Sequence, residues 1–320
     1  MSEPGHDEDE IQLPRSQTGA QPQHLIVTLF GDYWFGNTAH LPSSGLVALA
    51  NDFGISATSA RAALSRLARR GLLTSSKIGR RTFYGPTPRC VRVLEDGRQR
   101  IFSFGRDGLA SWDGTWLVVV FSVPEEQRDV RHALRTRLRW LGFAPLYDGV
   151  WASPRGQADE VQAVLAECGV EQATVLRSTV ITPELGSSSH PLAAWNLDQL
   201  ATAYHDFIAE FTPLRTRVRR GRINASEALV ERTAIMDTWR AFPNLDPELP
   251  PEVLPADWPR TAAYDLWAEV YDALTPLAAL RFKQLLAEYA PELAELAHYD
   301  TTQTALTAID AARLERRVSG

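Results

Sequence analysis

Side chains that can bind phosphate and read the edges of bases lie close together between residues 57 and 81. Guanidinium and ammonium groups pair with phosphate oxygens, and arginines and hydroxyls also form hydrogen bonds with base edges. Residues 24–100 carry eleven basic and four acidic side chains, although the whole 320-residue chain has a net charge of −6. Counterion release depends on the charge near the phosphates, so this local basic segment favours nucleic-acid binding despite the acidic total.

A helix over residues 57–70 is predicted to carry the first group of these side chains. Its apolar residues recur at helical spacing and form one stripe, made of Ala60, Ala63, Leu64 and Leu67. Ser56 is the expected N-cap and Gly71 the expected residue just beyond the end. On the polar side, the side chains expected at base edges are Thr58, Ser59, Arg61 and Ser65, and those expected at phosphates are Arg66 and Arg69.

Two shorter apolar segments come before this helix and predict the helices against which its stripe packs. They span residues 24–34 and 46–51. Gly54 can supply the positive φ that a tight turn between helices needs. A short helix, a glycine turn and a basic helix with no acid between Asp52 and Glu95 predict a helix-turn-helix.

A basic β-hairpin is predicted directly after the helix-turn-helix. Residues 72–77 and 80–84 have strand composition, and a turn lies at Ile78-Gly79. Lys77, Arg80 and Arg81 would lie at its tip, against the DNA backbone or in the minor groove. One arginine-rich helix alone is usually a solvated face, but this ordered set predicts a winged helix.

The middle of the chain has the order β-α-β-β-α-β, which predicts a ferredoxin-like fold. The predicted elements are strand 115–123, helix 125–141, strands 144–147 and 150–153, helix 157–168 and strand 173–181. Such a domain leaves a sheet face or edge free to pair with a second copy, so we expect it to form a homodimer. From residue 191 the chain is predicted to be mostly helical, with helices at 197–211, 226–239 and 261–288 and an extended proline-rich strap at 242–259. The fold class is therefore α+β.

The chain resembles the PaaX-type repressors of bacterial phenylacetate degradation. The resembling segments are Leu25–Asp32, Ser59–Leu67 with Gly71, Trp112–Trp116, Gly142–Ser153, Trp195–Leu197 and Phe242–Pro259. One departure is Asn196, where the family pattern has aspartate, and it is expected to affect only a local cap. The resemblance implies a dimeric repressor, cytoplasmic and not an enzyme, that leaves its double-stranded DNA operator when an aryl-CoA thioester such as phenylacetyl-CoA binds.

With this resemblance, the predicted organisation has six segments. They are a disordered acidic tail (1–23), a winged helix-turn-helix DNA-binding domain (24–88), a connector (89–114), a ferredoxin-like dimerisation domain (115–185), a mainly helical C-terminal domain linked to the effector (190–300) and a weakly ordered tail (301–320).

Two groups of residues are candidates for the effector site. Arg215, Arg217 and Arg219 begin a run of five arginines within residues 215–222, which could hold coenzyme A phosphates, contact DNA or form a solvated charge run. Trp112 and Trp116, together with Trp151 and Trp195, could line an aryl pocket or belong to a packed core.

Other classes of protein fit the sequence less well. The two cysteines are far apart and the N-terminus has no apolar signal segment, which predicts a cytoplasmic protein with no membrane segment, metal or cofactor. No nucleophile elbow, HExxH, P-loop or dinucleotide-binding motif is present. The alternative hypothesis is a vestigial winged helix on a protein whose later domains act as a metal-dependent nuclease or a protein-interaction module. The strand over 115–123 ends without a carboxylate for Mg²⁺, which disfavours the nuclease.

Overall fold

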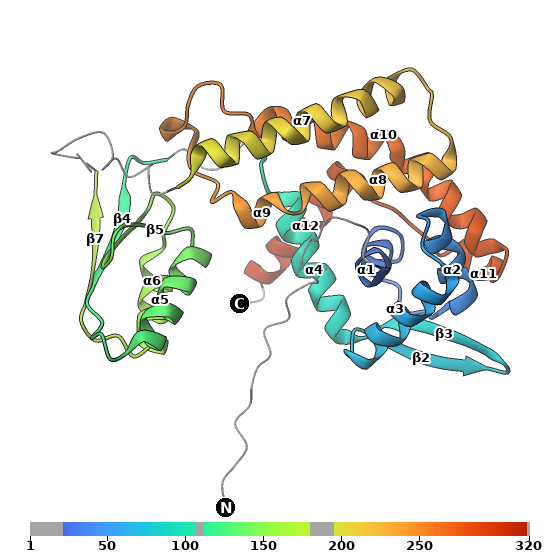
Figure 1. Cartoon of the computed structure of the whole chain (residues 1–320), viewed down its shortest axis with the longest axis horizontal. Helices are drawn as coiled ribbons and strands as arrows, with labels where there is room; N and C mark the ends of the chain where they lie inside the picture. The colour runs from blue at the N-terminus through green and yellow to red at the C-terminus, as the bar shows by residue number, and fades with distance from the viewer. Residues whose placement is uncertain (1–21, 107–111, 180–194, 319–320) are drawn as a thin grey trace, which may run out of the picture. The chain divides into compact units, whose positions relative to one another are not determined.

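Figure 1 shows the computed structural model, which describes residues 22–106, 112–179 and 195–318. The acidic tail predicted for residues 1–23 lies almost wholly outside the described residues. Two compact units divide the chain. We call residues 1–103, 211–241 and 267–320 the helical unit, and residues 104–210 and 242–266 the sheet unit. The six segments predicted from the sequence divide the helices differently from these two units. The roles assigned to those segments stay predictions.

The helical unit begins with three helices that pack together. They are α1 (Pro22–Tyr33), α2 (Ser43–Asp52) and α3 (Ala57–Arg69). The predicted stripe of α3 is fully buried against α1 and α2. Gly54 has φ +73° in the turn before α3, and Gly71 has φ +67° just after it, as the sequence predicted. Burying this stripe holds α3 with its polar face outward.

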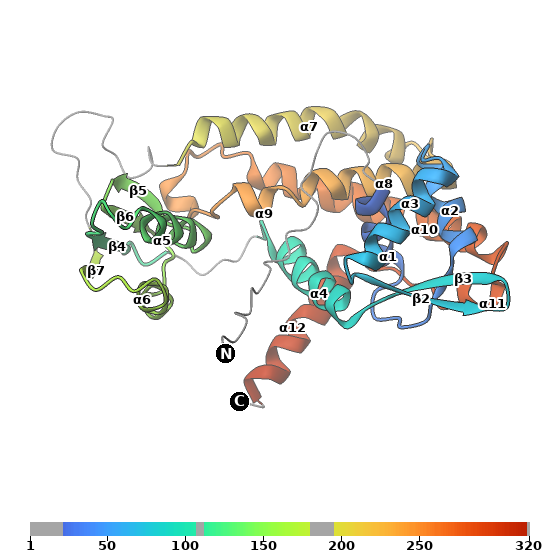
Figure 2. The same ribbon diagram turned by 60° about the horizontal axis from the view of Figure 1, so that its bottom comes forward.

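A three-stranded antiparallel sheet follows α3. Strands β2 (Leu73–Ile78) and β3 (Arg81–Pro86) form the predicted hairpin. Strand β2 lies one residue later than predicted, β3 begins one and ends two residues later, and the turn is Gly79-Arg80 in place of the predicted Ile78-Gly79. The two-residue strand β1 (Leu41–Pro42) pairs with the other edge of β3 and was not predicted. The ring of His40 lies so close to Gly85 that a Cβ atom there would come within 2.2 Å of it. Figure 2 shows β2 and β3 running side by side away from α3.

The segment predicted as a connector, 89–114, contains most of a helix, α4 (Pro88–Ser103). The sequence prediction gave too much weight to its glycines and prolines. Pro88 lies in the first turn, where its missing N–H is tolerated, and the Thr87 hydroxyl accepts a hydrogen bond from the amide of Cys90. Cys90 and Phe102 are buried, so tertiary packing stabilises the helix.

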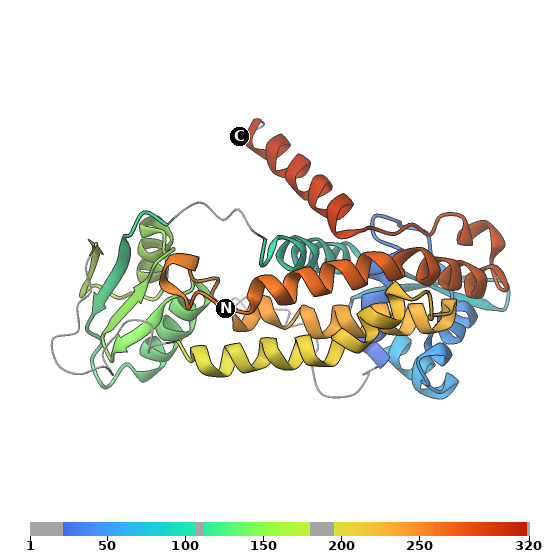
Figure 3. The same cartoon turned by 90° about the horizontal axis from the view of Figure 1, so that it is seen from above.

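The C-terminal helices complete the helical unit. They are α8 (Ala225–Trp239), the end of α7 (Leu197–Arg219), most of α10 (Arg260–Ala287), α11 (Pro291–Ala294) and α12 (Thr302–Val318). Figure 3 shows α8 running alongside α10, where Trp239 stacks on Trp267 at 4.9 Å. The segment predicted as a weakly ordered tail, 301–320, contains the helix α12, whose first residue Thr302 bonds to Asp272 and which packs against α4. None of the helices in the described ranges is both long and apolar enough to cross a membrane.

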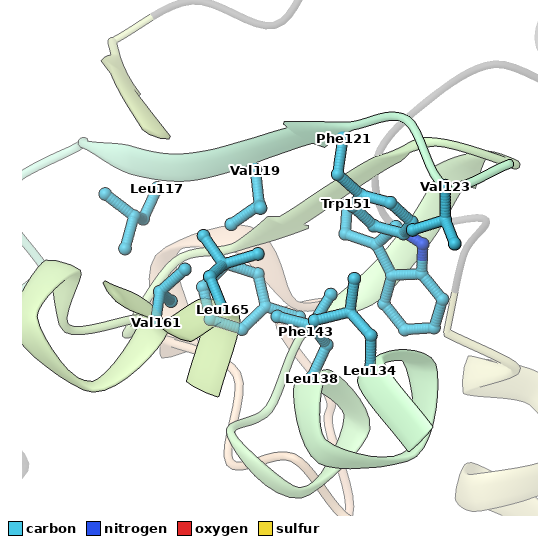
Figure 4. Close-up of a cluster of buried hydrophobic side chains, with 10 residues drawn as sticks. All are labelled: Leu117, Val119, Phe121, Val123, Leu134, Leu138, Phe143, Trp151, Val161 and Leu165. Atoms are coloured by element: carbon cyan, nitrogen blue, oxygen red, sulfur yellow. The ribbon is translucent and has the colours of Figure 1, made fainter. Parts of the chain in front are cut away.

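The sheet unit is built on a four-stranded antiparallel sheet in the order β5-β6-β4-β7. Its elements are β4 (Trp116–Phe121), α5 (Arg128–Trp140), β5 (Ala144–Tyr147), β6 (Val150–Ser153), α6 (Ala158–Glu167) and β7 (Ala173–Ser178). The two helices cover one face. Figure 4 shows Leu134 and Leu138 of α5 and Leu165 of α6 in one core with Val119 and Trp151 of the sheet.

The proline-rich segment 242–259 is not fully extended as predicted. It contains α9 (Phe242–Leu245) and the single 3-10 turn η3 (Pro251–Val253). Asp246 is buried in it, accepting a hydrogen bond from the Tyr204 hydroxyl at 2.5 Å and pairing with Arg260 at 3.4 Å. These bonds satisfy a buried carboxylate and so favour a turn over an extended strap. The chain as a whole combines small antiparallel sheets with a helical C-terminal region, which confirms the predicted α+β class.

Candidate nucleic-acid interface

The polar face of α3 lies open to solvent and begins at a capped helix N-terminus. The Ser56 hydroxyl accepts a hydrogen bond from the amide of Ser59 at 3.2 Å. The exposed side chains of this face are Thr58, Ser59, Arg61, Ser65 and Arg69. Arg66 is half-buried, and its Nε is buried without a hydrogen-bond partner. The structure therefore brings five of the six predicted α3 residues onto one exposed face and leaves Arg66 partly covered.

The charges on this face are not neutralised within the part of the chain that the structure describes. There, neither Arg61 nor Arg69 forms an ion pair with a carboxylate. No acidic residue lies between Asp52 and Glu95, so no carboxylate is close in sequence either. Unpaired guanidinium groups next to exposed hydroxyls and a helix N-terminus are suited to bind phosphate and base edges together.

The tip of the β2–β3 hairpin adds a second basic surface. Lys77, Arg80 and Arg81 are all exposed there. Midway along the hairpin, His40 Nδ1 and the Ser76 hydroxyl lie 2.8 Å apart, within hydrogen-bonding distance. The structure therefore confirms a basic tip on a braced hairpin, and whether the tip touches DNA stays a prediction.

An ion pair that the sequence analysis missed fixes the turn before α3. Arg281 of α10 donates hydrogen bonds to both carboxylate oxygens of Asp52, at 2.6 and 2.8 Å, and Ser226 donates a third at 3.2 Å. The hydrogen bonds from Arg281 hold the pKa of Asp52 below its usual value. Because the partners are 229 residues apart, no local sequence signal could have found this contact.

A fully buried arginine fixes the position of α1 in the same unit. Arg232 of α8 pairs with Asp32 at 3.4 Å and donates to the Thr275 hydroxyl at 3.0 Å. Its guanidinium lies 3.8 Å from the ring centroid of Tyr271, whose hydroxyl donates to Asp32 at 3.2 Å. Burial raises the pKa of Asp32 in spite of the arginine beside it. The helix that supports α3 is thereby tied to the C-terminal helices.

The predicted effector residues fall into both units. Trp112 and Trp116 belong to the sheet unit, with ring centroids 5.4 Å apart, and Trp195 lies 6.0 Å from Trp116. Trp116 is buried on the sheet face away from α5 and α6, whereas Trp151 is in the core beneath those helices. The structure thus brings three of the four tryptophans together as packed side chains.

The predicted arginine cluster belongs to the helical unit, and among the described residues two of its five arginines pair with carboxylates. Arg217 pairs with Glu227 at 2.9 Å and with Glu231 at 3.2 Å. Arg219 pairs with Glu269, while Arg215 is half-buried. An incoming phosphate would have to compete with these carboxylates. Among the described residues, no group of three or more His, Cys, Asp or Glu is arranged to hold a metal ion.

Comparison with known proteins connects all three parts of the chain to one family. Residues 21–89 match a model described as PaaX-like protein, residues 109–189 match the PaaX protein central Cas2-like domain, and residues 195–284 match the PaaX-like protein C-terminal domain. The transcriptional repressor PaaX of Escherichia coli (strain K12) is 28% identical over 263 residues, which are 81% of this chain and 81% of the relative. A solved structure, the uncharacterized protein Rv0674 from Mycobacterium tuberculosis, has a TM-score of 0.53 at 23% identity, covering 82% of this chain and 96% of that one. That last likeness supports the fold alone.

Proposed function

Because this chain belongs to the PaaX family, we propose that it is a transcriptional regulator that binds double-stranded DNA at specific sequences. The observation that carries the proposal is the polar face of α3, where exposed hydroxyls stand beside arginines that pair with no carboxylate among the described residues. The relative in Escherichia coli is named a transcriptional repressor, which supports repression as the mode of action. The proposed role is not enzymatic, and its place is the cytoplasm, where bacterial DNA is found.

In this proposal α1, α2, α3 and the β2–β3 hairpin form a winged helix-turn-helix. The N-terminal half of α3 enters the major groove, so that Arg61 and Ser65 reach base edges while Arg69 binds a phosphate. The hairpin lies against the adjacent backbone or minor groove. The exposure of these side chains and the buried stripe behind them support this arrangement.

We propose further that the β4–β7 sheet with α5 and α6 is a ferredoxin-like dimerisation domain. Its element order and its strand order, β5-β6-β4-β7, support that assignment. Strands β5 and β7 are edges with unpaired backbone groups, which a second copy can extend. A homodimer would present two recognition helices at successive major grooves, which are about 34 Å apart.

The regulated genes in this proposal form an aromatic-acid operon of the phenylacetate type, and the releasing ligand is an aryl-CoA thioester. The support is the family membership, and the rings of Trp112 and Trp116 pack against each other with centroids 5.4 Å apart. If Arg217 and Arg219 bind coenzyme A phosphates, the phosphates must displace Glu227 and Glu269. Such an exchange would couple effector binding to the helices α8 and α10.

The experiment that tests the proposal is a binding titration with DNA from the region upstream of the gene for this chain, at fixed salt, with and without phenylacetyl-CoA. Tight binding that resists competitor DNA is the expected result, and the thioester should release it. Binding that the thioester does not affect would support the proposed role as a regulator and contradict the proposed effector. Failure to bind any fragment specifically at low salt would overturn the regulator.

A further inference from the structure

The tip of the β2–β3 hairpin presents an apolar side chain among cations. Ile78 is 68% exposed, the largest exposed fraction of any large apolar side chain in the described ranges. Lys77, Arg80 and Arg81 are exposed around it. A side chain this exposed contributes little burial to the fold, so its place at the tip is better explained by what the tip touches.

The hairpin holds Ile78 in a defined position. Ile78 pairs with Arg81 at the last rung of the ladder, and a two-residue loop, Gly79-Arg80, joins them. Gly79 has φ +60° whereas Arg80 does not have a positive φ, which is the pattern of a type II′ turn. Directly opposed residues share a face, with Cβ atoms about 4.5–5.5 Å apart, so Ile78 stands beside Arg81.

Contacts in the middle of the hairpin restrict the movement of this tip. Strand β1 pairs with β3 on the side away from β2, and His40 bonds to Ser76, two residues before Ile78 on the same face. Because the turn is short and the strands are already paired, the tip loses little conformational entropy when it binds a partner. The hairpin can therefore push an apolar side chain against a partner.

We propose that Ile78 is a wedge that enters the minor groove and inserts between two stacked base pairs, kinking the DNA. This inference rests on the proposed function and deepens it. Proteins that bend DNA insert apolar side chains such as isoleucine between base steps, and arginines beside them are attracted to the negative potential of a narrow minor groove. Ile78 supplies the wedge, and Arg80 and Arg81 supply the attraction.

The charge of the tip favours DNA over a second copy of the chain as its partner. A contact between two such tips would bring Lys77, Arg80 and Arg81 against the same cations. No acidic side chain between Asp52 and Glu95 could offset that repulsion. DNA offers both a negative backbone and an apolar space between stacked bases.

The test measures the bend angle by circular-permutation electrophoresis on the upstream promoter fragment, together with affinity at several salt concentrations. Wild-type protein should bend the fragment by roughly 20–90°. Ile78→Ala should lower the bend by at least half and the affinity by roughly tenfold, because apolar burial between the bases is lost. Its salt slope should not change, because no phosphate contact is removed. Ile78→Met should keep most of the bend.

Leu314→Ala is the matched control, since Leu314 is 63% exposed on α12 of the same unit. It should leave both bend and affinity at the wild-type level. Specific binding without a bend, or an Ile78→Ala variant that bends DNA like the wild type, would overturn the wedge and leave the proposed function intact. A reduced salt slope in Ile78→Ala would also overturn it, because the residue would then act on phosphate contacts. If the wild type binds no fragment specifically, both the wedge and the proposed function are wrong.

Discussion

Two arginine-rich segments of the chain have similar compositions, but within the described residues only the second contains arginines that pair with carboxylates. In the first, over residues 61–81, Arg61 and Arg69 are exposed and form no ion pair within the described part of the chain. In the second, over residues 215–222, Arg217 contacts two glutamates and Arg219 contacts a third. Charge density along the sequence therefore does not decide which arginines are available to a ligand.

The difference follows from where the nearest carboxylates lie. The first segment is in a stretch without acids, while α8 and α10 place Glu227 and Glu269 beside the second. A guanidinium that already has a carboxylate must give up that bond to bind a phosphate, which lowers its net affinity. Four variants, one of them a matched control, test this distinction between arginines that bind ligands and arginines that hold the fold, beginning with the largest expected effect.

Arg232→Ala should have the largest effect, and it should act on stability. Arg232 is fully buried and pairs with Asp32, so its removal leaves an uncompensated buried carboxylate. We expect a loss of about 3–5 kcal/mol in the free energy of unfolding, measured by urea denaturation. The double variant Asp32→Asn/Arg232→Met removes both charges and should recover part of the loss. A loss below about 1 kcal/mol would show that Arg232 does not hold the unit together.

Arg61→Ala combined with Arg69→Ala should act on DNA binding and leave stability almost unchanged. Removing a base contact should cost about 1–3 kcal/mol of specific affinity, and removing a phosphate contact should lower the salt slope by about 1. Both side chains are exposed, so the melting temperature should stay near that of the wild type. The measurement is a titration of the promoter fragment at several salt concentrations.

Arg217→Ala is the matched control for that pair. Its surface ion pairs are worth less than about 1 kcal/mol, so it should lower stability slightly and leave DNA affinity unchanged. If Arg217→Ala weakened DNA binding as much as the α3 variant, the second arginine segment would also be a DNA contact, and the distinction drawn here would fail.

Arg281→Ala should lower the free energy of unfolding by an amount that depends on pH. Losing the charged hydrogen bonds to Asp52 should cost about 1–3 kcal/mol at neutral pH. The pKa of Asp52 is lowered in the folded chain. The contribution of the Asp52–Arg281 pair to the free energy of unfolding is therefore fully present above the unfolded carboxyl pKa of about 4, and it is lost as pH falls through the lower pKa of the folded chain. The difference between wild type and variant, followed by urea denaturation, should therefore shrink in acid. A difference that stays constant down to pH about 2 would contradict this assignment.

Local patterns in the sequence predicted the parts of the fold that depend on neighbouring residues. The stripe on α3, the glycines at 54 and 71, and the β-α-β-β-α-β order all appear as predicted. The Asn196 side chain accepts a hydrogen bond from the amide of Gln199 at the start of α7, so Asn196 lies at a helix cap, and the expectation that the departure affects nothing else stays a prediction. The exposure of the α3 side chains followed directly from the stripe, because a helix with one buried face presents the other.

Contacts between distant segments could not be predicted in the same way. Helix α7 continues past Pro213 to Arg219, because Phe211 and Leu214 are buried on its inner side. Helix α4 forms in a segment rich in charge because Cys90 is buried and Phe102 packs against Trp267, far along the chain. The pairs Arg281–Asp52 and Arg232–Asp32 have no local signature, since any arginine and any aspartate would look alike in the sequence.

Residues near the end of the chain cover part of α1. The fold can therefore be completed only after the ribosome has synthesised them. Tyr33 stacks on Phe282 with ring centroids 4.7 Å apart, and its carbonyl accepts a hydrogen bond from the amide of His298. Tyr33 thus receives this part of its cover some 250 residues after α1 is made, although α2 and α3 pack against α1 earlier. At roughly 5–20 residues per second, the apolar side of α1 waits on the order of tens of seconds for its cover. Nascent chains should accordingly depend on chaperones until synthesis is nearly finished, and an N-terminal fragment ending before residue 211 would keep that surface exposed.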